Sequence, residues 1–328
     1  DTKINLKQFI EKIDNALKNK NISVKFDKEF IEIIQQRKLE EQFTFIELYH
    51  ASKLKDSKIL DYLYFRFSLN KASTKFEELP VPLYLLVEPV SACNLKCPMC
   101  FQIDKSFTRK PFMGVMQWDL FTKVVDEASE IGVKAITLAS RGEPTLHPQF
   151  SKMLEYISKK DCFFDIKINT NATFLTNEIC HAIFKSNVST IVISADHYEK
   201  KTFEILRKNA NFEKIIKNVK NLFNIRKKNY PNSDTEIRVS GVDYYKNLDR
   251  KKFIEFWQPY SDIVTASYAE ERWDTYNNKP TDINTPCSFL WDRMYVWYDG
   301  KCNPCDNDYK SYLSYGNATK NSLIDIWN

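Results

Sequence analysis

Residues 91–100 read S-A-C-N-L-K-C-P-M-C and bring three cysteines, Cys93, Cys97 and Cys100, into one short segment. Three is an unusual number, because a structural zinc site takes four ligands and disulfides use cysteines in pairs. Three thiolates at a metal centre leave one coordination position open, and metal-dependent chemistry takes place at such open positions. The segment therefore predicts a reactive metal centre. It follows the first of several predicted strands, and these strands predict the fold around the centre.

The size and composition of the chain are those of a protein with a large buried core. The 328 residues are 43% hydrophobic, and intermingled charges of both signs give a net charge of +5. Such intermingling predicts a solvated surface and no nucleic-acid partner. No apolar run is long enough to span a membrane. The first residues, D-T-K-I-N-L-K-Q, lack the regions of a signal peptide, so we expect a cytoplasmic protein.

Six of the eight cysteines fall into two groups, at positions 93, 97 and 100 and at positions 287, 302 and 305. In a reducing compartment, grouped cysteines are more often metal ligands than disulfide partners. Cys162 and Cys180 stand alone among apolar neighbours, and we expect ordinary buried thiols there. The sequence thus predicts two separate metal-binding regions.

The first 80 residues are expected to form a helical N-terminal extension. Apolar residues recur at helical spacing in four stretches, which begin near positions 6, 30, 45 and 60. Pro80 and Pro82 then break the pattern and mark a boundary.

After residue 80, short apolar runs alternate with helical patterns. Six runs are predicted to be strands, at residues 83–88, 134–140, 164–170, 190–194, 236–242 and 262–267. Helices are expected between them, near residues 116–131, 148–159, 176–184, 212–223 and 253–257. Gly132 is expected to end the first of these helices, and Thr176 to cap the third. The alternation predicts a parallel sheet, because parallel neighbours need a crossover connection.

The predicted fold class is α/β, with a partial, open (βα)6 TIM-like barrel over residues 81–270. This length is short for a closed eight-fold barrel, which takes roughly 250 residues. Residues 1–80 form the helical extension, and residues 271–328 form a small loop- and hairpin-rich unit. The three cysteines follow the first strand and therefore lie at the functional face of a βα barrel.

In this setting, C-N-L-K-C-P-M-C resembles the CxxxCxxC signature of the radical S-adenosylmethionine (SAM) enzymes. The resemblance implies a [4Fe–4S] cluster held by Cys93, Cys97 and Cys100, whose open iron is chelated by the amino and carboxylate groups of SAM. It also implies reductive cleavage of SAM to a 5′-deoxyadenosyl radical that removes a hydrogen atom from the substrate. A zinc or redox cysteine cluster is the alternative interpretation of the same residues.

The segment R-G-E-P-T-L-H-P, residues 141–148, resembles the GGEP motif of this family, which follows the second strand. The resemblance implies that Gly142, Glu143 and Pro144 belong to the SAM site, where the backbone of the motif meets the SAM amino group. Arg141 departs from the first glycine of the motif, and glycine tolerates backbone conformations that arginine resists.

Three other residues match places that contact SAM in the family. Ser194 ends the fourth strand and would meet the ribose or the carboxylate, and Arg207 would pair with the carboxylate. Met99 holds a position that packs against adenine, which its polarizable sulfur allows. A strand-end hydroxyl and a solvated arginine are the alternatives for Ser194 and Arg207.

The stretch P-C-S-F-L-W-D-R-M-Y-V-W-Y-D-G-K-C-N-P-C-D-N-D-Y, residues 286–309, resembles the SPASM domain, or its shorter twitch form, which binds an auxiliary iron–sulfur cluster. The resemblance implies that Cys287 and Cys305 are ligands on either side of a β-hairpin that turns at Asp299-Gly300. Cys302 is an additional cysteine that could bind as a pair with Cys305. A fourth ligand beyond this sequence, an iron open to substrate and a zinc ribbon are open alternatives.

Asp306 directly follows Cys305 and matches the place of an aspartate that acts as general base in the sulfatase-maturating relatives. A carboxylate there could complete the oxidation of a C–H bond that bears a hydroxyl group. Asp308 competes for this role, and a structural hydrogen bond at the end of the hairpin is the alternative for Asp306.

These resemblances favour an oxidoreductase or dehydratase that oxidises, dehydrates or epimerises a carbohydrate-like small molecule, such as a sugar or nucleotide-sugar. The segment from 194 to 214 resembles members of polysaccharide and aminoglycoside pathways, and the single auxiliary region resembles the amino-inositol dehydrogenase type. A peptide- or protein-modifying enzyme is the second hypothesis, and a non-catalytic iron–sulfur or zinc protein is the third. An electron donor such as flavodoxin or ferredoxin is the expected partner of either enzyme.

Overall fold

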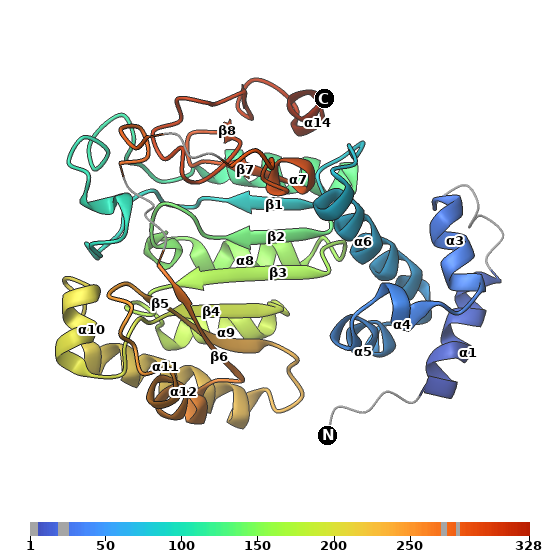
Figure 1. Cartoon of the computed structure of the whole chain (residues 1–328), viewed down its shortest axis with the longest axis horizontal. Coiled ribbons are helices and arrows are strands. Elements are labelled where there is room, and N and C mark those ends of the chain that lie inside the picture. The colour runs from blue at the N-terminus through green and yellow to red at the C-terminus, as the bar shows by residue number, and fades with distance from the viewer. Residues whose placement is uncertain (1–5, 19–25, 270–273, 280–282) are drawn as a thin grey trace. The chain divides into compact units, whose positions relative to one another are not determined.

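The computed structural model describes residues 6–18, 26–269, 274–279 and 283–328 (Figure 1). The chain divides into two compact units, Asp1–Leu79 and Pro80–Asn328. All sites discussed below lie in the second unit.

The described part of the first unit is helical, as predicted. Its helices are α1 (Leu6–Leu17), α3 (Lys28–Gln35), α4 (Leu39–Gln42), α5 (Phe45–Lys53) and α6 (Asp56–Lys75). Apolar side chains at helical spacing form the core of this unit, among them Phe9, Ile13, Phe30 and Leu63, each no more than 1% exposed. Helix α6 ends at Phe76 in a left-handed conformation.

The second unit is built on one sheet, whose described strands have the order β6-β5-β4-β3-β2-β1-β7-β8-β9. The first six strands are β1 (Tyr84–Val87), β2 (Ala135–Leu138), β3 (Asp165–Thr170), β4 (Thr190–Ser194), β5 (Glu236–Asp243) and β6 (Ile263–Tyr268). Each pairs in parallel with its neighbour. The six predicted strands and the α/β fold class are thus confirmed.

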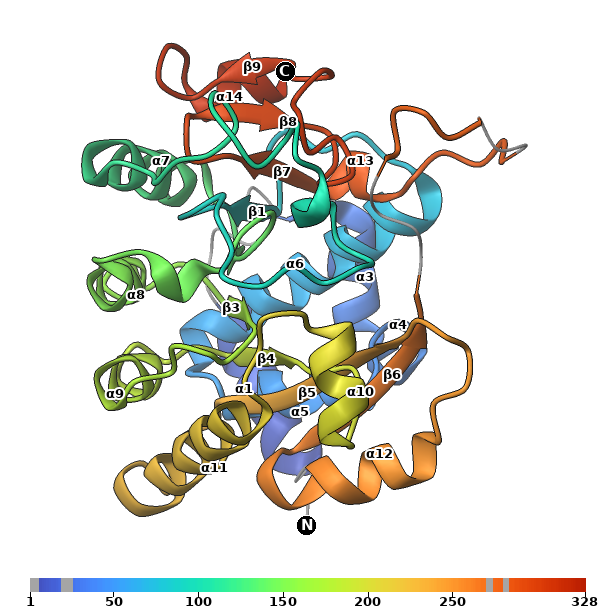
Figure 2. The same cartoon turned by 90° about the vertical axis from the view of Figure 1, so that its left-hand side faces the viewer.

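Helices connect these parallel strands, as crossover connections require. They are α7 (Trp118–Ile131), α8 (Phe150–Ser158), α9 (Asn177–Lys185), α10 (Lys200–Leu206), α11 (Phe212–Asn229) and α12 (Arg250–Trp257), with 3-10 turns η1 (Phe101–Ile103), η2 (Pro144–Leu146) and η3 (Gln258–Tyr260). Gly132 ends α7 at φ +92° and Thr176 caps α9 through the amide of Ile179, both as predicted. Figure 2, which looks toward the carboxyl ends of the strands, shows α7, α8, α9 and α11 in a row outside the curved sheet.

The C-terminal segment extends the same sheet instead of forming a sheet of its own. Strand β7 (Arg293–Val296) pairs in parallel with β1, and the hairpin continues through β8 (Lys301–Asn303) to β9 (Gly316–Asn317). The predicted hairpin turn at Asp299-Gly300 is confirmed, with Gly300 at φ +80°. Two short helices, α13 (Phe289–Asp292) and α14 (Leu323–Trp327), flank the hairpin. Residues 271–328, expected as a separate small unit, therefore share the sheet and the compact unit of the barrel in their described part.

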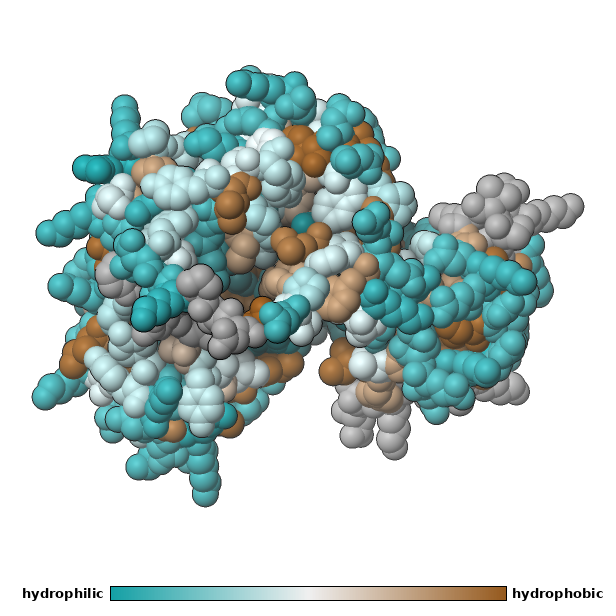
Figure 3. Space-filling model, turned by 45° about the horizontal axis from the view of Figure 1, so that its top comes forward, coloured by the Kyte–Doolittle hydropathy of each residue, from teal (hydrophilic) through white to brown (hydrophobic). Residues whose placement is uncertain are grey.

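Hydrophilic side chains predominate on the face of the second unit that Figure 3 shows. In the face shown in Figure 3, hydrophobic side chains lie in small patches among hydrophilic ones. No described helix combines the length and the apolar character that a membrane crossing requires.

Candidate active site

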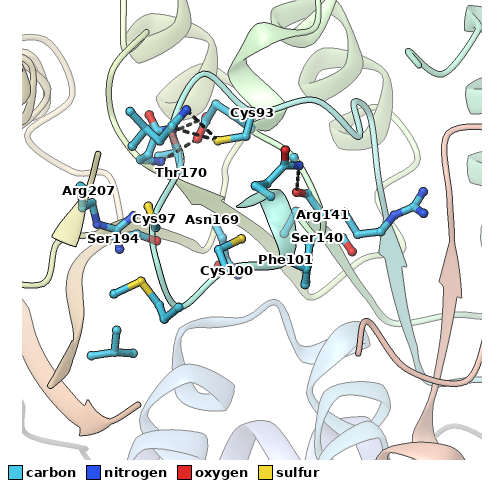
Figure 4. A pocket seen from close by; sticks show the side chains of 18 of the residues that line it. Cys93, Cys97, Cys100, Phe101, Ser140, Arg141, Asn169, Thr170, Ser194 and Arg207 are labelled. Atoms are coloured by element: carbon cyan, nitrogen blue, oxygen red, sulfur yellow. Dashed lines mark hydrogen bonds between the residues drawn. The ribbon is translucent and has the colours of Figure 1, made fainter. Parts of the chain in front are cut away.

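A cavity of about 320 Å³ lies at the carboxyl ends of the parallel strands, and Cys93, Cys97 and Cys100 line it together. Its wall comes from the loops after β1 and β2 and from the ends of β3, β4 and β5. Figure 4 shows the three cysteines around this space, with Arg207 near Cys97. The carboxyl ends of barrel strands meet at one face, which is why residues distant in sequence gather here.

The cysteine segment is held in place by its backbone. The amide of Cys100 donates to the carbonyl of Cys97 at 3.0 Å, and the amide of Lys96 donates to the carbonyl of Lys208 at 3.0 Å. Burial raises the pKa of Cys93 to about 11 and that of Cys97 to about 12. The positive charge of Arg207 opposes this rise for both thiols. Metal binding would have to displace these protons, because the thiolate is the ligand.

The three cysteines share one cavity. Within the described ranges, no three His, Cys, Asp or Glu side chains are placed to hold one metal ion. Three cysteines around a shared cavity are the donor set that a four-iron cluster uses.

The loop after β2 packs directly on the cysteine segment. A Cβ atom on Gly142 would lie 2.1 Å from the carbonyl oxygen of Val90 and 2.5 Å from that of Ala92, so this position requires glycine. The amide of Glu143 donates to the carbonyl of Ala92 at 3.0 Å. Pro144 begins the turn η2 and is buried. The predicted GEP residues thus line or border the cavity and hold its two loops together.

The Glu143 side chain connects the second and third strands. Its Oε1 accepts hydrogen bonds from the amide and hydroxyl of Thr145, at 3.2 and 2.5 Å, and from the Thr170 hydroxyl at 2.6 Å. Its Oε2 accepts from the amide of Asn171 at 2.7 Å. Burial raises the pKa of Glu143, although each of these hydrogen bonds lowers it. The carboxylate is therefore engaged by the protein and holds the ends of these two strands together.

Arg141 does not adopt the backbone conformation that would require glycine. The unusual conformation belongs to the preceding residue, Ser140, at φ +111°, and Arg141 has no positive φ. The Arg141 side chain points away from the cysteines and forms a buried ion pair with Glu88 (Figure 4). Arginine therefore meets no conformational penalty at this position of the motif.

Arg207 is held at the cavity by Asp196. Its Nε lies 2.8 Å from Asp196 Oδ2, and its Nη2 donates to Oδ1 at 3.1 Å. Burial alone would lower the pKa of Arg207, but the Asp196 carboxylate raises it above the ordinary value, so the guanidinium stays charged. Ser194 and Met99 line the same cavity. The structure thus brings together five of the six residues predicted to contact SAM with the three cysteines, whereas Pro144 follows Glu143 in the chain and is not part of the lining.

Three buried polar atoms of residues that line the cavity have no hydrogen-bond partner among the described residues, namely the Ser140 hydroxyl oxygen and the side-chain oxygens of Gln102 and Asn169. Buried polar groups are nearly always hydrogen-bonded, so these atoms can accept hydrogen bonds from a polar ligand in the cavity. Together with the charged Arg207 they fit a ligand that carries both hydrogen-bond donors and a carboxylate, as SAM does.

The three C-terminal cysteines separate into two environments. Cys287 is exposed and Cys305 is half-buried, and burial raises the pKa of the Cys305 thiol. Cys302 is fully buried in the main core, and its thiol faces the carbonyl of Gly300 at 3.6 Å. The structure therefore directs Cys302 into the core and leaves Cys287 and Cys305 outside it.

The two candidate bases also differ in their surroundings. Asp306 lines the cavity of the three N-terminal cysteines. Asp308 is 5% exposed, and its Oδ1 accepts from the Tyr276 hydroxyl at 2.8 Å and from the amide of Tyr312 at 2.9 Å. Its Oδ2 accepts from Asn303 at 2.6 Å and from the amide of Leu313 at 2.8 Å. Asp308 thus organises its own loop, whereas Asp306 faces the site.

Sequence reasoning did not single out Glu88, Asn169 or Asp196. A signal was present for each, because all three are polar residues at the carboxyl ends of apolar strands. Their functional meaning depends on which strand ends meet, which only the sheet order shows.

Two family models match the sequence of this chain. The model of the Radical SAM superfamily matches residues 87–256, and the SPASM model, an iron-sulfur cluster-binding domain, matches residues 287–328. The first match alone covers half of the chain.

Two curated relatives illustrate the sequence similarity. The tungsten-containing aldehyde ferredoxin oxidoreductase cofactor-modifying protein of Pyrococcus furiosus is 36% identical over 114 residues, 34% of this chain and 30% of that protein. A GTP 3′,8-cyclase of Clostridium botulinum is 26% identical over 182 residues, 52% of this chain and 56% of the cyclase. The matches thus span less than two thirds of either relative.

Three solved structures share the fold. Streptococcus suis SuiB bound to precursor peptide SuiA has a TM-score of 0.60 at 18% identity, over 91% of this chain and 76% of SuiB. For anSMEcpe with bound AdoMet the TM-score is 0.59 at 17% identity, over 75% of this chain and 80% of that chain. For BtrN in complex with AdoMet and 2-DOIA it is 0.51 at 16% identity, over 77% and 84%.

The family models, the motif residues and the lining of the cavity all indicate the same family of cluster-binding proteins. A radical SAM domain implies a [4Fe–4S] cluster and SAM, and a SPASM domain implies an auxiliary iron–sulfur cluster. The chain belongs to the radical SAM superfamily and carries a C-terminal SPASM domain.

Proposed function

We propose that this chain is a radical SAM enzyme that oxidises a hydroxyl-bearing, carbohydrate-like small molecule in the cavity of its three N-terminal cysteines. The observation that carries the proposal is that Asp306, from the SPASM segment, lines the same cavity as Cys93, Cys97 and Cys100. A carboxylate and a cluster site thereby share one cavity.

Different residues of the cavity would bind the cluster and SAM. Cys93, Cys97 and Cys100 would hold the cluster, and the charged Arg207 would pair with the SAM carboxylate. When bound, the cluster and SAM supply the one-electron chemistry that removes a hydrogen atom from the substrate. Cys287 and Cys305 would contribute to the auxiliary cluster site.

Backbone groups and small side chains complete the SAM site. The backbone of Gly142, Glu143 and Pro144 borders the place where the amino group would lie, beside Ser194. Met99 lines the cavity and would pack against the adenine. These assignments rest on the positions of the residues and on the family motifs that they match.

Asp306 would act as the base of the oxidation. A carbon that bears a hydroxyl group and has lost a hydrogen atom becomes a carbonyl when the hydroxyl proton and one further electron leave. Asp306 would accept the proton, and a one-electron acceptor would take the electron. Asp308 has its oxygen atoms occupied by four hydrogen bonds and is the weaker candidate.

A peptide substrate is the second candidate, and a specific observation favours it. The fold similarity to SuiB, a structure bound to its precursor peptide, covers 91% of this chain, which is more than the unit Pro80–Asn328 alone provides. Part of the N-terminal helical unit therefore has a structural counterpart in that peptide-bound protein. A flavodoxin or ferredoxin as electron donor, and a cytoplasmic location, complete the proposal for either substrate.

Anaerobic incubation of the iron-loaded protein with SAM and a reductant tests the proposal. Candidate sugars, amino-sugars and peptides are added one at a time, and 5′-deoxyadenosine and deuterium transfer from labelled substrate are measured. We expect a hydroxylated small molecule to stimulate cleavage and transfer its deuterium, whereas stimulation by peptides alone would select the second candidate. Absence of SAM cleavage under all conditions would refute both.

The Asp306→Asn variant separates the base from the earlier step. We expect it to transfer deuterium from the substrate but to form little carbonyl product. A variant that oxidises the substrate at the full rate would remove Asp306 from the role of base.

A further inference from the structure

Arg141 stands where the family motif has glycine, and its long side chain runs from the wall of the cavity to the SPASM segment. Its side chain is 2% exposed and that of Glu88, its ion-pair partner, is fully buried. Arg141 Nε donates to Glu88 Oε2 at 2.6 Å, and Nη2 donates to Oε1. This two-pronged geometry fixes the direction of the guanidinium plane.

The guanidinium group reaches the C-terminal segment at two points. Its Nη1 donates to the backbone carbonyl of Tyr309 at 2.8 Å, and its carbon atom lies 4.5 Å from the centre of the Trp297 ring. The Glu88 carboxylate also accepts from the amide of Tyr298, at 3.3 Å. One buried ion pair therefore contacts the hairpin turn and the segment that follows Asp306.

The carbonyl group of Arg141 connects to the cysteine segment. The Arg141 amide donates to Glu88 Oε2 at 3.3 Å, and the carbonyl accepts from the side-chain amide of Gln102. The same Gln102 amide donates to the carbonyl of Ser91 at 2.7 Å. Arg141 thus connects the loop that carries the cluster cysteines with the segment that carries Asp306.

We propose that Arg141, paired with Glu88, is a positioning residue that holds the segment 306–309 at the cavity. The inference rests on the proposed function for the role of Asp306, but not for the contacts themselves. Buried ion pairs contribute little net stability compared with apolar pairs of the same volume. The charged pair instead fixes the orientation of the guanidinium group, because this group donates hydrogen bonds to two carboxylate oxygens and one carbonyl oxygen at once.

The other side of this segment has an anchor of its own. The Tyr309 ring stacks on Phe101 at 5.0 Å between ring centres, and its hydroxyl donates to Asp104 at 3.0 Å. Loss of Arg141 should therefore loosen the side of the segment that faces the cavity without unfolding the segment.

The double variant Glu88→Gln/Arg141→Met tests this role, because it removes both charges together. Either single variant leaves a buried charge without its partner and is expected to be strongly destabilised, whereas the double variant should melt within about 3 °C of the wild type. The control is Arg226→Met/Asp262→Asn, which removes an ion pair of the same unit with contacts at 2.5 and 2.7 Å.

Amide hydrogen exchange of the segment 306–313 is the main measurement, since the amides of Asp308, Lys310, Tyr312 and Leu313 are hydrogen-bonded. In the Glu88/Arg141 double variant we expect exchange there to be faster by at least about threefold, with no change in the control variant. SAM added to the iron-loaded wild type should slow this exchange, and the double variant should lose that response.

The possible outcomes separate the two proposals. A double variant that melts normally, exchanges as the wild type does and retains the response to SAM would overturn the positioning role. Faster exchange with a lost response at a normal melting temperature supports it, since a contribution to stability alone would be restored when both charges are removed. SAM binding to the wild type is measured in parallel by equilibrium dialysis, and its absence would contradict the proposed function but not the contact of Arg141 with the segment.

Discussion

Replacing Gly142 with alanine should push apart the two loops that form the floor of the cavity. The added Cβ atom would lie 2.1 Å from the Val90 carbonyl oxygen, so backbone must move by about 1 Å to reach an allowed contact. Such overpacking costs about 1–3 kcal/mol. The movement also stretches the 3.0 Å hydrogen bond from the Glu143 amide to Ala92, at a cost of about 1 kcal/mol.

The total, about 2–4 kcal/mol, corresponds to a melting temperature lower by roughly 5–15 °C for a unit of this size. Iron content after anaerobic reconstitution, measured below both melting temperatures, should fall in the Gly142→Ala protein because the cysteine segment is displaced. Gly132→Ala is the control, since Gly132 has φ +92° and no atom within 4 Å of its added Cβ. It should lose stability through backbone strain, by about 1–2 kcal/mol, but keep its iron.

A Gly142→Ala protein with the wild-type melting temperature and full iron content would refute this reasoning. It would mean that the two loops can move apart without lowering the free energy of unfolding, and that their close contact does not position the cysteines. Equal loss of iron in both variants would contradict the reasoning as well, because general destabilisation would then explain the effect.

Three further predictions concern other parts of the molecule. Cys97→Ala should lower the iron content and abolish both the spectral change on adding SAM and the formation of 5′-deoxyadenosine. Burial would raise the pKa of Asp104, but hydrogen bonds from Ser106 and Lys310 lower it well below its ordinary value. This interaction therefore stabilises the fold above the unfolded-state pKa of about 4 and is lost as the pH falls toward the folded-state pKa. Asp104→Asn should cost about 1–2 kcal/mol at pH 7 and less at pH 3, by urea unfolding; an equal loss at both values would contradict it. Thr44→Ala removes the capping box of α5 and should raise amide exchange in that helix by the equivalent of about 1 kcal/mol, whereas unchanged exchange would show that the cap contributes nothing.

Much of the fold could be predicted from the sequence because its signals are local. Apolar runs predicted six strands, and Gly132 and Thr176 marked helix ends through backbone conformation and capping. The pairing of β7 with β1 could not be predicted, because the four residues R-M-Y-V carry no signal that selects one neighbouring strand. Helix α10 was also missed, since its seven residues are too few to show a helical period.

The site residues could likewise be predicted where the signal is local in the sequence, but not where it depends on distant residues. The spacing of Cys93, Cys97 and Cys100 indicated a shared centre, and the structure places all three at one cavity. The sequence could not decide between Asp306 and Asp308, because only one residue separates them and both follow the hairpin. The difference arises from side-chain direction, which depends on partners such as Tyr276 that lie far away in sequence.

The parallel pairing of β1 with β7 also determines when the sheet can be completed. The ribosome produces β1 about 200 residues before β7, so one side of β1 has no strand partner during most of synthesis. Contacts between such distant segments form slowly, and an unpaired strand edge can join a neighbouring chain. Nascent chains of this protein should therefore need shielding by chaperones until the hairpin has emerged, and shortened forms that end before it should aggregate.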